Sequence, residues 1–332
     1  MNPAEGPLVG AVAIGKNEGE RLKGCLRSLE EHASHLVYVD SGSSDGSVEF
    51  ARAMGVDVVE LDSTVPFTAA RARNAGVERL SQLAPEVKYA QLIDGDCELV
   101  DGWIEDAVDF LEKSPEYAAA AGRLRERFPD ASVYNYLCDV EWNTPIGDAD
   151  ACGGIAMMRV RAFQAVGGFL PGLIAGEEPE LCVRLRREGW KIRRLDSDMA
   201  LHDVAMTRFS QWWKRTVRAG HAYAEGAYLH GAPPERMGVR QSRRMVAWGL
   251  VLPAVSIVGG PLTEGLSLFL LLAYPLNMIR IARRLRADGQ SRPWTLAFFL
   301  MLAKIPEAIG WLRFQWGKLT GDRSTLIEYK GH

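Results

Sequence analysis

Short apolar runs alternate with stretches of helical periodicity along the first part of the chain. Strands are expected at residues 8–15, 36–39 and 56–61, and in the run 89–93 that leads into Asp94. Helices are expected between them, at residues 18–31, from about residue 45, and at 68–83. This alternation is typical of an α/β fold with a doubly wound, mainly parallel sheet. Ligands then bind at the carboxyl ends of the strands, here near Asn17, Asp40 and Asp94.

The pattern loosens after about residue 115, where helices are expected at 135–142, 178–188 and 209–228 and a strand at 156–158. Further on, residues 245–263 and 265–279 contain no charged side chain, and Glu264 alone separates them. A straight bilayer span needs about 20 apolar residues, and Pro253, Gly259-Gly260 and Pro261 interrupt the first run. A bent membrane hairpin or interfacial helices are therefore predicted. A buried helical pair in a soluble domain is the alternative.

Charge divides the chain at a similar place. Residues 1–230 carry 25 Lys and Arg against 36 Asp and Glu, a net charge of −11, whereas residues 231–332 carry 14 against 6, a net charge of +8. The acidic part argues against nucleic-acid binding, and the basic, apolar part fits an anionic membrane surface. We expect an α/β domain at 1–230 and a helical membrane-associated region at 231–332. Arginines flank both sides of the apolar hairpin, which predicts that both of its ends face the cytoplasm.

The chain has five cysteines, Cys25, Cys97, Cys138, Cys152 and Cys182. No two of them form a C-x-x-C pair, and their number is odd. This spacing favours reduced cytoplasmic thiols over a disulfide framework or a zinc site.

Asp94-Gly95-Asp96 carries the clearest chemical signal. Two carboxylates one residue apart repel each other unless a cation lies nearby, and their oxygen atoms suit Mg²⁺ or Mn²⁺, which bind diphosphates. A polar turn is the alternative. Asp40 opens a Ser- and Gly-rich run that a ligand can approach closely, and it is placed to accept hydrogen bonds from a base or ribose. Of Arg71 and Arg73, two apart on an expected helix, Arg73 is the better candidate to face a diphosphate.

Several short motifs occur in a fixed order along the chain. They are Ala13-Ile14-Gly15-Lys16-Asn17-Glu18, Val39-Asp40-Ser41-Gly42-Ser43, Arg73-Asn74-Ala75-Gly76, Asp94-Gly95-Asp96, Cys152-Gly153-Gly154 and Gly176-Glu177-Glu178. This ordered set resembles the family 2 glycosyltransferases over about residues 8–230. The resemblance implies the GT-A nucleotide-sugar fold, a nucleoside-diphosphate sugar donor and inversion at the anomeric carbon.

The resemblance also implies roles for single residues. Donor-binding positions would be Asn17, Glu18, Asp40, Arg73, Asn74, Asp94, Gly153 and Gly154. Asp94 and Asp96 match the family's D-x-D, which holds Mg²⁺ or Mn²⁺ on the diphosphate, and some enzymes of this fold complete that site with a late histidine, here His202. A lone histidine is more often structural.

The Gly176-Glu177-Glu178 motif matches the family's Glu-Asp element, which supplies the catalytic base. Glu178 stands where the family has aspartate, so the base is expected to be Glu178 or its neighbour Glu177. A structural alternative exists for both, because carboxylates are favoured at a helix N-terminus.

These expectations combine into an inverting, metal-dependent hexosyltransferase on the cytoplasmic face of the inner membrane. It would transfer a sugar to a carbohydrate or lipid-linked acceptor in cell-envelope, exopolysaccharide or glycolipid synthesis. Two alternatives remain, a sugar nucleotidyltransferase and a non-catalytic membrane scaffold that keeps the fold.

Overall fold

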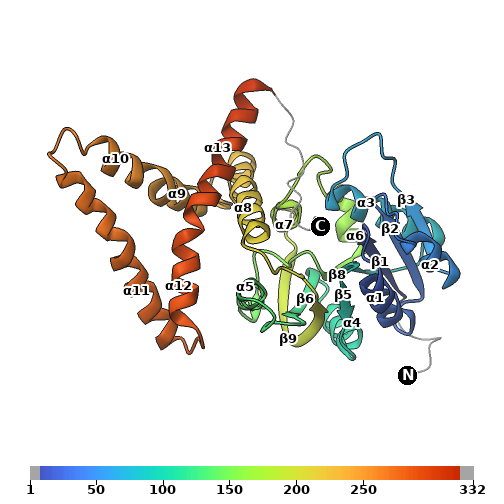
Figure 1. The fold of residues 1–332 in the computed structure, drawn as a ribbon. Helices are drawn as coiled ribbons and strands as arrows, with labels where there is room; N and C mark the ends of the chain where they lie inside the picture. Colours follow the sequence, from blue (N-terminus) through green and yellow to red (C-terminus); the bar gives the residue numbers. More distant parts are fainter. Residues whose placement is uncertain (1–7, 322–332) are drawn as a thin grey trace. The chain divides into compact units, whose positions relative to one another are not determined.

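The computed structural model describes residues 8–321. The chain divides into two compact units between Thr207 and Arg208 (Figure 1). The sequence placed the division after residue 230, but the observed boundary precedes α8 (Phe209–His230). The reason is that α8 packs along α13 (Lys304–Thr320) within the second unit. Residues 1–7 and 322–332 of the two expected domains lie outside the described part of the chain.

Half of the sheet in the first unit is the parallel array that the apolar runs predicted. Its strands, in spatial order, are β3 (Asp57–Glu60), β2 (His35–Asp40), β1 (Val9–Gly15) and β4 (Tyr89–Asp94). The register pairs Gly15 with Asp40 and Ile14 with Asp94. The carboxyl ends of β1, β2 and β4 therefore lie level at one edge of the sheet.

The other half of the nine-stranded sheet is mixed. β8 (Ala156–Arg159) runs antiparallel to β4 and to β6 (Tyr117–Glu126), and β6 runs parallel to β9 (Lys191–His202). The short strands β5 (Cys97–Leu99) and β7 (Gly147–Asp148) pair antiparallel with β9. Because Cys97 pairs with His202, β9 carries that histidine to the turn that holds Asp96.

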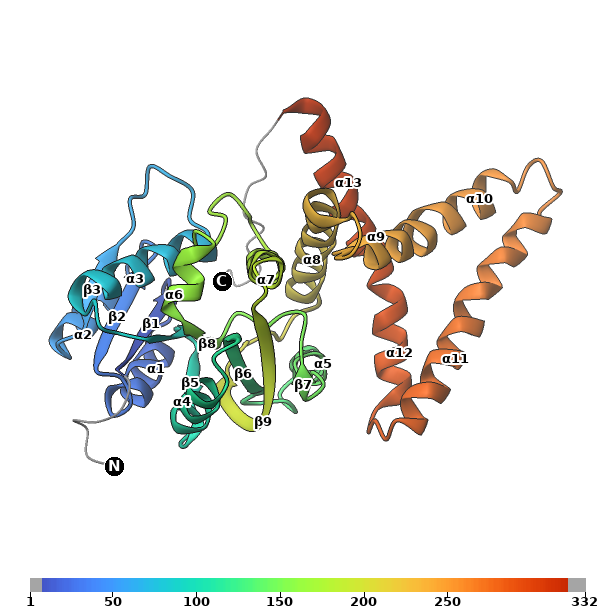
Figure 2. The same cartoon turned by 180° about the vertical axis from the view of Figure 1, so that it is seen from behind.

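Helices cover both faces of this sheet, as a doubly wound fold requires. The core on one face includes residues of α1 (Glu20–Glu30), α2 (Ser47–Ala53) and α4 (Trp103–Lys113). The core on the other face includes residues of α3 (Ala69–Leu83), α6 (Val160–Ala165) and α7 (Glu177–Arg187). Both views show β1 running between α1 and α3 (Figures 1 and 2). Along β1 the side chains alternate between the two cores, with Val12 in one and Ala13 in the other.

The second unit is helical. After α8 come α9 (Val239–Val246), a π-helical turn (Ala247–Val251), α10 (Leu252–Val258), the 3₁₀ helix η2 (Leu266–Leu272), α11 (Ala273–Ala287), α12 (Pro293–Leu302) and α13. α8 and α13 approach closely at two glycines, because a Cβ on Gly220 or on Gly310 would lie 2.0 Å from a backbone oxygen of the other helix. Of the residues expected to interrupt the first apolar run, Pro253 does not do so, because the helix continues through it near the start of α10. The helix ends at Val258, directly before the expected break at Gly259-Gly260.

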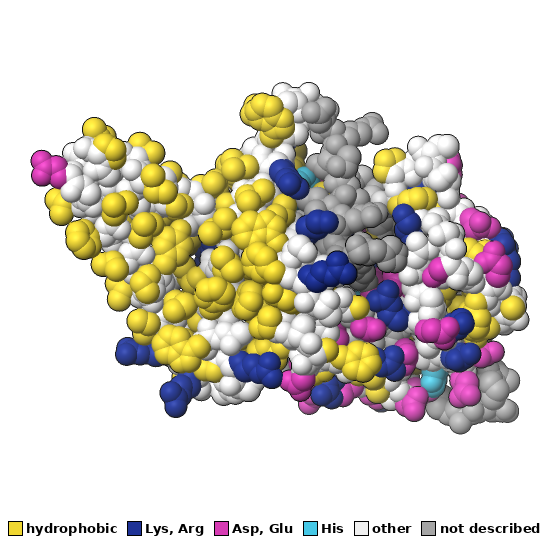
Figure 3. Space-filling view, viewed as in Figure 1, with side chains coloured by type: hydrophobic (Ala, Val, Ile, Leu, Met, Phe, Trp, Pro, Cys, Tyr) yellow, Lys and Arg dark blue, Asp and Glu magenta, His cyan; other side chains and the backbone are white. Residues whose placement is uncertain are grey.

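Two stretches of the second unit are long and apolar enough to cross a bilayer. They are residues Leu266–Ala287 and Pro293–Thr320. Large apolar side chains on these two stretches are exposed. Leu266 and Phe269, for example, are each 67% exposed. Figure 3 shows hydrophobic side chains gathered over this part of the unit.

Candidate active site

Arg73 lies at the centre of the candidate site, on the first turns of α3. Its side chain is 3% exposed, and its guanidinium donates to Asp94 Oδ1 at 2.7 Å and to Glu177 Oε1 at 2.8 Å. Burial lowers the pKa of Arg73, but the two carboxylates more than offset this, so that the pKa is raised overall. Residues from three distant motifs of the sequence therefore share one buried, permanently charged cation.

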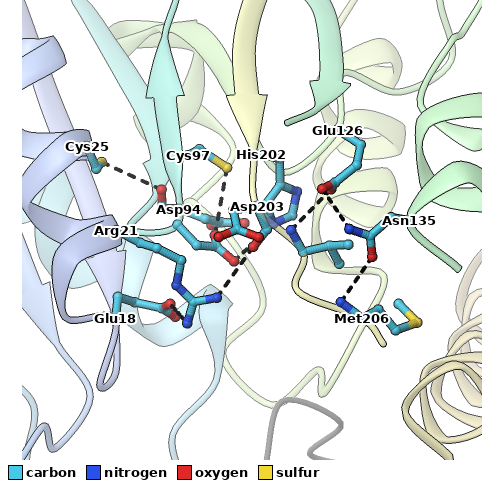
Figure 4. A network of polar contacts seen from close by, with 12 residues as sticks. Glu18, Arg21, Cys25, Asp94, Cys97, Glu126, Asn135, His202, Asp203 and Met206 are labelled. Carbon is cyan, nitrogen blue, oxygen red and sulfur yellow. Dashed lines mark hydrogen bonds and ion pairs between the residues drawn. The ribbon is translucent and has the colours of Figure 1, made fainter. Parts of the chain in front are cut away.

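Asp96 and His202 form a second contact at the same edge of the sheet. His202 Nε2 lies 3.0 Å from Asp96 Oδ2, and both side chains are buried. Trp142 stacks on the imidazole with ring centroids 4.6 Å apart. In the described part of the chain, Nδ1 of His202 is buried without a hydrogen-bond partner. Figure 4 shows Asp94, His202 and Asp203 close together, with the ion pair of Arg21 and Glu18 beside them.

The side chains at this point fit a divalent cation. Ligand atoms of Asp96, Cys97 and His202 lie within 4.8 Å of one another. Asp94 presents a partly exposed carboxylate, of which Arg73 holds one oxygen. Carboxylate oxygens are the ligands that Mg²⁺ and Mn²⁺ prefer, and a histidine nitrogen is a common addition. Of the three residues that the sequence proposed as metal ligands, Asp94 ends β4, Asp96 lies in the turn that follows, and His202 ends β9.

The two glutamates at the start of α7 have different partners. α7 begins after Gly176, whose φ of 79° is left-handed. Glu177 contacts Arg73, whereas Glu178 Oε1 accepts a hydrogen bond from the amide of Cys152 at 2.5 Å and another from the thiol of Cys182 at 2.9 Å. Glu178 is therefore tied to the loop that precedes β8, and Glu177 to the arginine.

The glycine loop reaches the same place. Gly153 has a φ of +84°, and a Cβ on Gly154 would lie 2.9 Å from Nη2 of Arg73. Only a residue without a side chain lets this backbone pass so close to the guanidinium. The loop expected near the transferred sugar therefore lies beside Arg73 and Asp94.

The expected nucleoside-binding residues hold the loops at the ends of β1 and β2. Asn17 Oδ1 accepts from the amide of Ser44 at 2.7 Å. Asp40 is 2% exposed and accepts from the hydroxyl of Tyr38 and from the amides of Gly42 and Ser43. These contacts fix the backbone of the loops that follow β1 and β2.

Glu18 and Asn74 are also engaged. Glu18 pairs with Arg21 at 2.7 Å, and Asn74 makes a two-way amide contact with the backbone of Phe169, at 2.8 Å in each direction. Asn74 therefore connects α3 to the segment that leads to α7 and supports the position of Arg73 on α3. Its side-chain amide is already engaged by this backbone contact.

Three features of the site were not visible in the sequence. Trp142 follows α5 (Val133–Glu141) and gave no motif, and Asp203, directly after His202, was not singled out. Cys152 and Cys182 are separated by 30 positions, so no spacing rule connects them, yet their sulfur atoms lie 3.7 Å apart. Only the fold brings these residues to the site.

Comparison with known proteins identifies the family. Residues 12–167 match the family model for glycosyl transferase family 2. Residues 12–167 therefore form a glycosyl transferase family 2 domain. The glycosyltransferase is 25% identical over 268 residues to the succinoglycan biosynthesis protein ExoA of Rhizobium meliloti, covering 72% of this chain and 76% of that protein.

A solved structure shares the architecture of this glycosyltransferase. It is that of a mannosyltransferase from Pyrobaculum calidifontis in complex with GDP-Man and Mn²⁺, with a TM-score of 0.63 and 18% identity, covering 95% of this chain and 89% of that one. The GT-A fold expected from the sequence is confirmed, with its apolar C-terminal helices.

Proposed function

We propose that this glycosyltransferase moves a hexose from a nucleoside-diphosphate sugar to an acceptor hydroxyl with inversion, in the synthesis of a polysaccharide or glycolipid. The observation that carries the proposal is the bridge from Asp94 through Arg73 to Glu177. It joins the metal–diphosphate motif to the base motif, so the two halves of a transfer site are held at one point.

The residues that would hold the cation are Asp94, Asp96 and His202. A bound Mg²⁺ or Mn²⁺ there would offset the negative charge of the departing diphosphate. Arg73 adds a fixed positive charge behind Asp94, and Gly153 and Gly154 leave room for the sugar. ExoA's role in succinoglycan biosynthesis and the GDP-Man and Mn²⁺ of the structural neighbour support this assignment.

Glu178 is the base that we propose for the acceptor hydroxyl. It takes the proton, the acceptor oxygen attacks the anomeric carbon on the face opposite the diphosphate, and the nucleoside diphosphate leaves. Glu177 is the weaker candidate, because Arg73 already neutralises it at 2.8 Å. A carboxylate paired with a guanidinium is a poorer proton acceptor than one bonded only to neutral groups.

We further propose that the second unit attaches the enzyme to the cytoplasmic face of the membrane. Its exposed apolar side chains are too numerous for a water-facing surface. The basic side chains next to them, Arg280, Arg283, Arg284 and Arg286, fit anionic headgroups.

A donor screen followed by product analysis tests the function. Purified full-length enzyme in detergent would be heated with a panel of nucleotide sugars and Mn²⁺, and the true donor should raise the melting temperature. That donor should then yield free nucleoside diphosphate and a product of inverted anomeric configuration. Release of pyrophosphate would favour a nucleotidyltransferase, and no turnover with any stabilising donor would favour a non-catalytic scaffold.

A further inference from the structure

We propose that Cys152, Cys182 and Glu178 form a second metal site, for a thiol-binding divalent cation such as Zn²⁺. One ligand atom from each lies within 4.8 Å of the others, and all three side chains are buried. The site differs from the Asp96–His202 cluster in chemistry, since two of its three ligands are sulfur.

The spacing of the sulfur atoms fits tetrahedral coordination. Zn–S bonds are about 2.3 Å long, so two sulfur ligands of a tetrahedral Zn²⁺ lie roughly 3.8 Å apart. The two Sγ atoms here are 3.7 Å apart. A disulfide would need them at about 2.0 Å, which requires a much larger shift.

The carboxylate of Glu178 lies within 4.8 Å of both sulfur atoms. Its Oε1 is 2.9 Å from Sγ of Cys182 and 2.5 Å from the amide nitrogen of Cys152. On binding, the metal ion would replace the thiol proton of Cys182 that now lies between Sγ and Oε1 of Glu178. Oε1 would then move slightly away from Sγ. A water molecule would supply the fourth ligand.

The charge of the bound site is supported by its position on α7. Two thiolates, one carboxylate and Zn²⁺ sum to one negative charge. Glu178 is the second residue of α7, at the end of the helix where the macrodipole favours negative charge, and Cys182 lies one turn later. Burial raises the pKa of Cys182 to about 11, and the contact with Cys182 followed by burial raises the pKa of Cys152. Metal binding therefore has to displace a proton from each thiol.

Binding at this site should inhibit transfer, a consequence that rests on the proposed function. A metal ion on Glu178 removes the lone pair that would accept the proton of the acceptor hydroxyl. It also fixes Cys152, which directly precedes the Gly153-Gly154 loop. Micromolar Zn²⁺ would therefore lower kcat even with saturating Mn²⁺ or Mg²⁺ at the Asp–His cluster.

Cobalt spectroscopy tests the site without reference to activity. Reduced full-length enzyme in excess Mg²⁺ would be titrated with Co²⁺, which should give an intense near-ultraviolet sulfur-to-cobalt band for two thiolates. Zn²⁺ should then displace it at one equivalent. Cys152→Ala and Cys182→Ala should weaken Zn²⁺ binding by more than the roughly 10–100-fold that loss of an outer-shell partner causes.

Two control variants isolate the ligand set. Cys138→Ala changes another buried thiol, and Cys97→Ala changes the thiol beside Asp96. Both should keep the full band and the full Zn²⁺ affinity. Zn²⁺ inhibition of any measured transfer should disappear in Cys182→Ala, judged against the metal-free rate of that variant.

Three results would overturn the site. The first is the absence of a thiolate–cobalt band in the unsubstituted enzyme, and the second is a band that survives Cys182→Ala. The third is formation of a Cys152–Cys182 disulfide under mild oxidation, seen as the loss of two titratable thiols, in an enzyme that takes up no metal after it is reduced again. A positive metal titration with no glycosyl transfer would refute the proposed function and leave this site standing.

Discussion

Nη2 of Arg73 lies 2.7 Å from Oδ1 of Asp94. The other terminal nitrogen of the same guanidinium lies 2.8 Å from Glu177, at the start of a different helix. The arginine side chain is almost entirely buried, so neither carboxylate can lose this partner to water. The position of the base motif is thereby coupled to that of the metal motif.

Arg73→Gln should destabilise the first unit strongly. Removing one partner of a buried ion pair leaves uncompensated charge and costs about 3–5 kcal/mol, and here two carboxylates are left. Urea unfolding of the purified protein measures the change. Arg79→Gln, on the same helix but 40% exposed in its pair with Asp57, should change the stability far less than Arg73→Gln. Equal losses for the two variants would contradict a buried bridge.

The parallel half of the fold could be predicted because each strand there contains a short apolar run. β6 and most of β9 were missed. The buried start of β6 contains four consecutive alanines, Ala118 to Ala121, which carry little strand preference, and Lys191 to Asp198 in β9 are rich in charge. Both strands are held by pairing with their neighbours rather than by local preference.

The candidate site was predictable one motif at a time, but its connections were not. The sequence indicated Asp96 and His202 separately, and 106 positions separate them. Their contact depends on the pairing of β5 with β9, which no local pattern shows. For Glu178 the sequence indicated a base, and the fold adds the two cysteine contacts.

Asp96→Asn should abolish metal-dependent transfer while leaving the protein folded. The substitution keeps the size of the side chain and its contact with His202 but removes the charge that attracts a divalent cation. The thermal shift produced by Mn²⁺ with the true donor should disappear together with activity. Asp109→Asn, on the exposed side of α4, is the matched control and should retain both. An unchanged Mn²⁺ shift in Asp96→Asn would remove Asp96 from the metal site.

Glu178→Gln and Glu177→Gln should separate the base from its neighbour. Glu178→Gln should lower kcat by at least about 100-fold, the lower end of general-base contributions, with a nearly unchanged KM for the donor. Glu177→Gln should instead lower the melting temperature, because it leaves Arg73 with Asp94 alone. Steady-state kinetics and thermal unfolding on both variants provide the comparison. The reverse pattern would make Glu177 the base.

Leu266→Asp combined with Phe269→Asp should release the enzyme from membranes. The two residues are three apart in the 3₁₀ helix η2, so they share a face, and each is 67% exposed. Burying a large apolar side chain in lipid contributes roughly 1.5–3 kcal/mol, all of which the charged replacements forfeit. Flotation of full-length protein with anionic vesicles measures the effect. Val65→Asp, also an exposed apolar position but in the first unit, should float normally, and equal loss in both variants would point to general unfolding.

Glu225 on α8 should make the stability of the second unit depend on pH. Burial raises the pKa of Glu225 from 4.5 to about 7, so between these values the folded state holds more protons than the unfolded state. Its contribution is therefore fully present below about pH 4.5 and is lost as pH rises toward 7. His221 lies 3.6 Å away, and burial and then Arg313 lower its pKa from 6.5 to about 4. Its contribution to stability therefore rises with pH up to about 6.5, opposite to the trend of Glu225.

The difference between Glu225→Gln and the unsubstituted protein isolates the glutamate, because His221 is present in both. The variant should gain melting temperature relative to the parent as pH rises from 4.5 to 7, and the difference should level off above that range. Glu20→Gln, whose side chain is 85% exposed, should show no such trend. A difference that stays constant from pH 4.5 to 7.5 would mean that Glu225 is ionised in the folded protein, and that the His221–Glu225 contact on α8 is an ordinary ion pair.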